Sequence, residues 1–223
     1  MPTATKKPYK GLGMEGWMAR WYARTRGVDI EDFRQQAAAV AQRLGRGVVL
    51  EVAPGPGFFA VELAKLGDFQ VTGLDISRTL VQIASDNARA AGVRVDFRQG
   101  NASAMPFPPA SFDSVYCSAA FKNFTEPVAA LDEMHRVLRP SGEALIVDLR
   151  KDVSLAEIDS YVRQSGRTRL DAWMTRWAFR SFLIRRAYSR QQFCQMAADS
   201  RFGSCLLTLG PIGFEARLAK LPS

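Results

Sequence analysis

The sequence has few of the residues that build metal centres and disulfide frameworks. Its 223 residues include three cysteines and one histidine, His135. The cysteines, Cys117, Cys194 and Cys205, are odd in number and lack C-x-x-C spacing, so we expect no metal site and no disulfide scaffold. No apolar run approaches the ~18 residues of a membrane-spanning helix, and no apolar signal segment follows Met1. These absences favour a soluble, cytoplasmic protein.

Composition and charge then narrow the class. With 47% apolar residues the chain can bury a core, which excludes disordered and collagen-like proteins. The net charge of +8 is unevenly spread. Residues 1–46 have nine Lys/Arg against four Asp/Glu, residues 47–149 eight against twelve, and residues 150–190 ten against four. The basic flanks could bind a nucleic acid, an anionic membrane or an anionic substrate. They could equally form a solvated surface that binds none of these.

The acidic middle of the chain alternates between strand and helix patterns. β-Branched runs predict strands over 47–53, 70–75, 94–98, 112–117 and 143–148. Helical periodicity between them predicts helices over 58–66, 80–91 and 127–138, with a turn over 139–142. Such alternation is typical of a doubly wound α/β fold with a mostly parallel sheet.

The two ends of the chain have other patterns. Residues 9–44 predict two helices interrupted at Gly27, and residues 154–200 are almost wholly helical in pattern. The tail predicts two strands, 204–209 and 214–219, around a Gly-Pro turn.

A glycine-rich loop follows the first predicted strand. Gly55-x-Gly57-x-x-Ala60 satisfies the dinucleotide fingerprint, and Asp75 ends the second strand, where a carboxylate can accept two ribose hydroxyls. Glycines there let the backbone approach a ligand at the start of a helix. A nicotinamide-dependent oxidoreductase is therefore one interpretation of these residues.

Four ordered motifs favour another interpretation. They are Glu51 to Gly57, Gly73 to Ser77, Gly100 to Phe107 with Ser111 to Val115, and Leu138 to Glu143. Together they resemble the class I S-adenosylmethionine-dependent methyltransferases, in particular the small-molecule branch similar to the ubiquinone/menaquinone C-methyltransferases. The resemblance implies a Rossmann-like, mostly parallel seven-stranded sheet with an antiparallel last strand, and S-adenosylmethionine as cofactor.

The resemblance also implies roles for particular residues. Ala53, Gly55 and Gly57 would pack on the methionine part of the cofactor, and Glu51 would orient its ammonium, directly or through water. The remaining cofactor-binding candidates are Asp75 for the ribose, Ile76, Asn101 and Ala102 for the adenine, Ser118 near the methionine, and Tyr22 closing over the cofactor. Asp75 as a helix cap, Asn101 as a turn residue and Tyr22 as a core residue are the structural alternatives.

Two residues depart from the family pattern. Ala53 replaces the first glycine of the first motif, and we expect its φ to be below zero because a side chain disfavours the left-handed region. Asn101 replaces the usual aspartate at the adenine position. Its amide can still accept from the adenine amino group and donate to N1.

No catalytic base is identified. A base is needed only if the nucleophile must lose a proton, and His135 is expected to be structural on the helix before the fifth strand. Tyr9, Lys122 and Asn123 are expected near the strand ends or the lid, and nothing in the sequence singles out one of them.

The domain plan is a single methyltransferase domain, 1–223. Its parts are an N-terminal helical lid (1–46), a cofactor-binding core (47–149), a helical cap (150–200) and a C-terminal strand pair (201–223). Within the cap, Trp177, Phe179 and Leu183 are the candidate substrate residues, since they place apolar surface among arginines.

The expected reaction is methyl transfer to a small apolar or aromatic acceptor. An RNA methyltransferase, an NAD-dependent oxidoreductase and a cofactor-binding module without turnover are the alternatives. No base-flipping motif is present, so a nucleic acid is not the expected partner. The basic cap could instead contact an anionic membrane. The acceptor, the attacked atom and the oligomeric state are left open.

Overall fold

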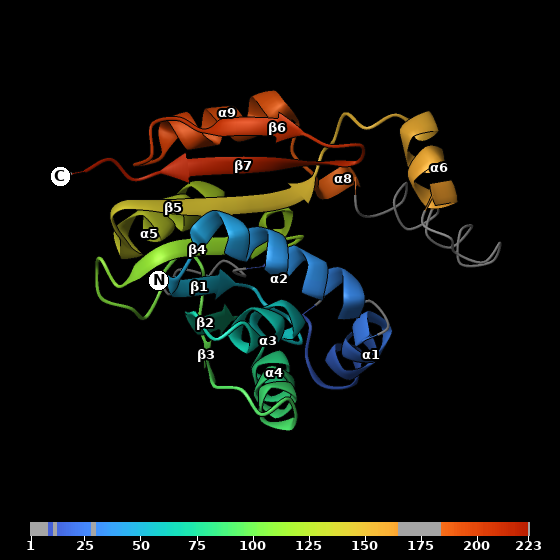
Figure 1. Cartoon of the computed structure of the whole chain (residues 1–223). Coiled ribbons are helices and arrows are strands. Elements are labelled where there is room, and N and C mark those ends of the chain that lie inside the picture. Colours follow the sequence, from blue (N-terminus) through green and yellow to red (C-terminus); the bar gives the residue numbers. More distant parts are fainter. Residues whose placement is uncertain (1–8, 11–12, 28–29, 165–183, 223) are drawn as a thin grey trace, which may run out of the picture.

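The computed structural model describes residues 9, 10, 13–27, 30–164 and 184–222. Its centre is one sheet of seven strands in the order β3-β2-β1-β4-β5-β7-β6 (Figure 1). The strands are β1 (Gly47–Val52), β2 (Phe69–Asp75), β3 (Val95–Gln99), β4 (Phe112–Ser118), β5 (Leu138–Leu149), β6 (Leu206–Leu209) and β7 (Gly213–Ala219).

Five neighbouring strands are parallel and two are not. Strands β3, β2, β1, β4 and β5 pair in parallel, whereas β7 runs antiparallel to both β5 and β6. This arrangement confirms the predicted Rossmann-like fold with an antiparallel ending. It also brings the carboxyl ends of β1, β2, β4 and β5 to one edge of the sheet, where ligands bind in such folds.

Helices cover both faces of the sheet (Figure 1). They are α1 (Gly16–Arg26), α2 (Ile30–Leu44), α3 (Phe58–Lys65), α4 (Arg78–Ala90), α5 (Pro127–Val137), α6 (Leu155–Gln164), α8 (Ile184–Arg186) and α9 (Arg190–Asp199), with the short 3-10 helix η2 (Phe121–Asn123). None of the helices in the described ranges is long and apolar enough to cross a bilayer.

Two apolar clusters form the core because alternate residues of each strand point to opposite faces. On one face, Val49, Val71 and Tyr116 pack with α2 and α3. On the other, Leu50 and Val115 belong to a larger cluster with residues of α5, α9 and β7. Apolar side chains therefore cover both faces of the sheet.

Strand β5 is longer than predicted. The sequence predicts a turn over 139–142, but β5 already begins at Leu138, which pairs with Phe112 across an irregular register. The backbone of this segment also bonds to the end of β7, where Ser141 N–H donates to the Lys220 carbonyl at 3.0 Å. These backbone partners keep the segment in the sheet although Ser141 has a φ of 64°.

Candidate functional site

The loop between β1 and α3 comes close to its neighbours at two glycines. Gly57 has a φ of 77°, and a Cβ there would lie 2.7 Å from both the Ala84 Cβ and the Phe97 ring. Gly55 has a φ of 58°, and a Cβ there would lie 3.6 Å from the Tyr22 ring. Glycine is thus required at 57 by conformation and by space, as the motif predicts.

Ala53, the first residue of the same loop, corrects an expectation. We expected a φ below zero, but φ is 57°, in the left-handed region. The residue joins β1 to the loop, and its N–H still donates to the Leu74 carbonyl of β2 at 2.8 Å. The chain must turn at this point, so the alanine adopts the glycine-like conformation, which costs about 1–2 kcal/mol.

Asp75 lies at the carboxyl end of β2 and is buried. Its Oδ2 accepts from Gly55 N–H at 3.0 Å and its Oδ1 from Ser77 N–H at 2.9 Å. Burial raises the pKa of the carboxyl to about 6, while these backbone N–H groups oppose the rise. Each carboxylate oxygen has a second lone pair, so Asp75 can still accept two hydroxyl groups.

Glu51, on β1, is a buried acid without a cation. Its Oε2 has no hydrogen-bond partner among the residues that the structure describes. Burial raises the pKa of this carboxyl to about 8. A buried polar atom without a hydrogen-bond partner destabilises the folded protein. A ligand ammonium would supply the donor and the positive charge that this carboxylate lacks.

The predicted adenine residues follow β2 and β3, which are neighbours in the sheet. Gly100 N–H donates to the Asp75 carbonyl at 2.9 Å, and the Gln99 side chain donates to the Ile76 carbonyl at 3.3 Å. These bonds hold the two strand ends together. Ile76 and Asn101 thus follow adjacent strand ends, as the motifs predict.

Asn101 forms a local turn. Its Oδ1 accepts from Ser103 N–H at 3.0 Å, and Ala104 pairs with it in an isolated bridge. Ala102, between them, packs partly buried against the larger core cluster. Asn101 thus acts as a turn residue, which was the structural alternative to a role in binding adenine. Its side-chain NH₂ group still has donors for a ligand.

Tyr22 and Ser118 come from two further elements, α1 and β4. Tyr22, on α1, is near enough to Gly55 to touch a side chain there. Ser118 ends β4 and hydrogen-bonds to Tyr116, whose pKa is raised mainly by burial. Tyr116 in turn is paired in register with Glu51 of β1. The predicted residues from β1, β2 and β4 therefore end at one edge.

Tyr9 is one of the three residues that we expected near the strand ends or the lid. It forms an isolated bridge with Phe124, next to η2. Burial raises the pKa of its phenol, and charges on Arg186, Asp75 and Asp148 also act on it. The N-terminal segment thus reaches the edge formed by β2 and β5. The helical pattern predicted from residue 9 is wrong at this point, because Tyr9 forms a bridge and the first helix begins at Gly16.

Lys122 is not available as a base, because it is held in a buried ion pair. Its Nζ lies 2.7 Å from Asp148 Oδ1 and also donates to the Ala119 carbonyl. Asp148 Oδ2 accepts from Lys122 N–H at 2.8 Å. The pair fixes the loop after β4 against the end of β5.

His135 is away from the site, as expected. It lies on α5, and its ring meets Phe202 edge-on at 5.1 Å between centroids. Burial, followed by the charges of Lys220 and Arg201, lowers its pKa.

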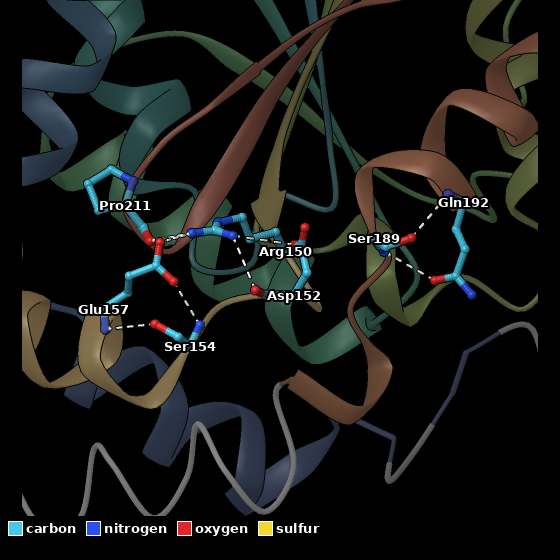
Figure 2. Close-up of polar contacts among 7 residues, drawn as sticks. All are labelled: Arg150, Asp152, Ser154, Glu157, Ser189, Gln192 and Pro211. Carbon is cyan, nitrogen blue, oxygen red and sulfur yellow. Dashed lines mark hydrogen bonds and ion pairs between the residues drawn. The ribbon is translucent and has the colours of Figure 1, made fainter.

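Polar contacts order the two ends of the predicted cap that the structure describes (Figure 2). The buried Arg150 guanidinium bonds to Glu157 of α6, and to the Pro211 carbonyl at 3.3 Å. At the start of α9, Ser189 and Gln192 form a reciprocal capping box. The candidate substrate residues Trp177, Phe179 and Leu183 lie outside the described residues.

Comparison with known proteins agrees with this geometry. Residues 50–146 match a family described as a methyltransferase domain. A demethylmenaquinone methyltransferase of Deinococcus radiodurans is 37% identical over 123 residues, which cover 55% of this chain and 51% of that protein. A 2-phytyl-1,4-naphtoquinone methyltransferase of Synechococcus elongatus is 32% identical over 130 residues, covering 56% and 54%. The chain thus spans about half the length of these curated relatives.

Solved structures share the fold over nearly the whole chain. A protein of Methanococcus maripaludis, 18% identical, has a TM-score of 0.75 and covers 96% of this chain and 97% of its own. A methyltransferase of Aquifex aeolicus, 17% identical, has a TM-score of 0.62 and covers 86% and 99%. Together with the matched domain and the curated relatives, these confirm the resemblance. Residues 50–146 thus match a methyltransferase domain, and this part of the chain is similar to that of the class I S-adenosylmethionine-dependent quinone C-methyltransferases.

Proposed function

We propose that the protein transfers a methyl group from S-adenosylmethionine to a small, largely apolar or aromatic acceptor. The observation that carries this proposal is the buried Glu51 Oε2, which has no partner among the described residues, at the edge where Asp75 and the glycine loop also lie. This cofactor has an ammonium and a ribose diol, which match an unpaired carboxylate and a second carboxylate one strand away. A nicotinamide dinucleotide would use the second acid, but it has no ammonium group that could donate hydrogen bonds to Glu51, because its pyridinium nitrogen carries no N–H.

The residues of the chain bind and orient rather than react. When bound, S-adenosylmethionine supplies an already activated methyl group. Glu51 would hold the ammonium, Asp75 the diol, and Ile76, Asn101 and Ala102 the adenine, while the backbone of Ala53, Gly55 and Gly57 allows close approach. Tyr22 would close over the cofactor, and Ser118 would lie near its methionine part. Catalysis would then come largely from holding the acceptor in line with the methyl group.

Relatives support an aromatic acceptor. Their names describe methylation of demethylmenaquinone and of a phytyl-naphthoquinone, so we propose a quinone-type acceptor for this chain. Residues 1–46 and 150–200 are the proposed lid and cap around it, with 47–149 as the cofactor-binding core and 201–223 completing the sheet. The cytoplasm is the proposed location.

Calorimetric titration separates the proposal from its alternatives. We expect S-adenosylhomocysteine to bind and NAD to give no heat. Binding of NAD without binding of S-adenosylhomocysteine would overturn the cofactor assignment. Binding without methylation of any quinol, tested with labelled S-adenosylmethionine and mass spectrometry of the products, would point to a module without turnover.

The proposed cap has its own test. Replacing both Phe179 and Leu183 with serine is expected to reduce methylation of the acceptor while leaving S-adenosylhomocysteine affinity nearly unchanged, because the cofactor loops lie on other elements. Replacing Leu206 and Leu209 with serine, at exposed positions of β6 outside the proposed cap, is a matched control. Normal methylation by the double variant would show that these residues do not contact the acceptor.

A further inference from the structure

Helix α1 exposes its large aromatic residues and buries its small ones. Trp17 is 72% and Trp21 60% exposed, whereas Ala19 and Ala23 are buried. A helix on a globular protein normally does the reverse, because burying a tryptophan removes far more apolar surface from water. The two tryptophans therefore do not stabilise the packing of α1 against the described residues.

Arginines share the exposed face with the tryptophans. Residues three or four apart lie on one side of a helix, so Trp17, Arg20, Trp21 and Arg24 form one outward stripe, here called the α1 surface. All four residues are exposed. Helix α1 contains three arginines and no acidic residue, so the charge of this surface is wholly positive.

Contacts on the other side hold α1 firmly. The Glu15 carboxylate accepts from Arg78 N–H at 2.8 Å and from Thr79 N–H at 3.0 Å, at the start of α4. Gly16 N–H donates to the Thr79 hydroxyl at 3.0 Å. Helix α1 lies at the periphery of the molecule (dark blue in Figure 1). The α1 surface is thus presented outward by a fixed element.

We propose that the α1 surface docks on an anionic lipid bilayer. Tryptophan rings have an apolar body and a polar N–H, and they prefer the headgroup level of a membrane. Guanidinium groups bind lipid phosphates by paired, charge-assisted hydrogen bonds. The charge of the region supports this partner, since residues 1–46 have nine Lys/Arg against four Asp/Glu.

Charge also argues against a second copy of this chain as the partner. In a twofold contact each α1 surface would face an identical one, and Arg20 and Arg24 would then meet the same cations. A bilayer that contains anionic lipid has no such repulsion.

Docking would place the lipid next to the cofactor loop. Tyr22, on the protein side of the same helix, lies against Gly55, so α1 separates the glycine loop from the proposed bilayer. The idea that docking brings a lipophilic acceptor to the site rests on the proposed function. The docking itself does not depend on that function. The two can therefore fail separately.

Vesicle flotation with the full chain tests the docking, without cofactor or acceptor. Vesicles of phosphatidylcholine with roughly 30 mol% phosphatidylglycerol are compared with pure phosphatidylcholine. The wild type should float with the anionic vesicles. Trp17→Ser with Trp21→Ser should weaken this binding at least about tenfold. Arg20→Gln with Arg24→Gln should weaken it about 10- to 30-fold, with little effect on pure phosphatidylcholine.

A control variant removes apolar surface elsewhere. Leu206, 63% exposed, and Leu209 lie on the edge strand β6. Changing both to serine should leave vesicle binding unchanged. Tryptophan fluorescence is a second measurement: a blue shift on adding anionic vesicles should be lost in the Trp17/Trp21 variant, although Trp173 and Trp177 remain.

Several results would overturn the proposal. They are no flotation of the wild type, equal flotation of wild type and tryptophan variant, or an equal loss in the β6 control. Size-exclusion chromatography adds another: if the wild type self-associates, the tryptophan variant does not, and vesicles bind neither, then the α1 surface is a contact between copies. Circular dichroism verifies that each variant is folded. Unchanged S-adenosylhomocysteine affinity in the tryptophan variant shows that only docking was removed.

Discussion

Replacing Glu51 with glutamine should stabilise the ligand-free protein and weaken its binding of cofactor. Burial raises the pKa of the Glu51 carboxyl from 4.5 to about 8, and the Asp75 charge adds to the rise. The unfolded chain loses this proton near its ordinary pKa, whereas the folded chain keeps it. The folded state therefore binds more protons in this interval, and stability falls as pH rises.

The size of the effect follows from that shift. A rise from 4.5 to about 8 corresponds to at most about 5 kcal/mol of unfolding free energy, lost in full once the pH exceeds the folded pKa. Glutamine keeps the shape and does not titrate. The stability difference between variant and wild type should thus be small near pH 5 and reach several kcal/mol near pH 9, or roughly 10–20 °C in melting temperature. Asp75 titrates in both proteins, so its contribution to the pH dependence largely cancels in the difference between them.

Binding should change in the opposite direction. S-adenosylhomocysteine affinity should fall roughly 10- to 100-fold in the variant, because a charged hydrogen bond is worth about 1.5–3 kcal/mol. At about pH 6.5 the wild type should release close to one more proton per bound ligand than the variant, since an ammonium favours the ionised carboxylate. Calorimetry in two buffers of different ionisation enthalpy measures this release.

Two results would refute this reasoning. One is a stability difference between Glu51→Gln and wild type that does not grow between pH 5 and pH 9. The other is wild-type affinity and proton release in the variant. Either would show that Glu51 is not the buried, unpaired acid that receives the ammonium.

Three further substitutions test other parts of the site. Asp75→Ala should weaken S-adenosylhomocysteine binding by about 2–4 kcal/mol in titration calorimetry, because two charge-assisted bonds are lost non-additively; unchanged affinity would disprove its ribose role. Ala53→Gly should raise stability by about 0.5–1 kcal/mol in urea unfolding, since relief of a left-handed alanine exceeds the entropy cost of glycine; a destabilised variant would contradict the strain. Lys122→Met should cost about 3–5 kcal/mol because Asp148 then loses its cation, whereas Lys122→Met with Asp148→Leu should recover much of it.

Much of the fold could be predicted from local patterns. The strand predicted over 70–75 is β2 (Phe69–Asp75) and the helix predicted over 127–138 is α5 (Pro127–Val137), since alternation of period two and helical periodicity are both local properties. The placement of Asp75 beside Gly55 follows as well, because the carboxyl ends of parallel strands meet at one edge. The structure has this contact as a hydrogen bond of 3.0 Å from Gly55 N–H to Asp75 Oδ2.

Other features depend on distant contacts that no local pattern records. The φ of Ala53 is set by the course of the chain between β1 and α3, and the early start of β5 by its pairing with Phe112 and Lys220. Tyr9 lies near Asp75 only because the N-terminal segment pairs with Phe124. Helix α1 buries its alanines and exposes its tryptophans. Helical periodicity could not predict this, because it shows that the two faces of a helix differ but not which of them is buried.

Three buried acids at the same edge of the sheet show which part of the site lacks a partner. Asp148, on β5, receives the Lys122 ammonium at 2.7 Å. Asp75, at the end of β2, receives two backbone N–H groups. Glu51, on β1, has one oxygen with no donor among the described residues. An uncompensated buried acid destabilises a protein, and a bound cation would offset that cost. We therefore propose that the ligand's ammonium binds at β1 and its neutral hydroxyls at β2.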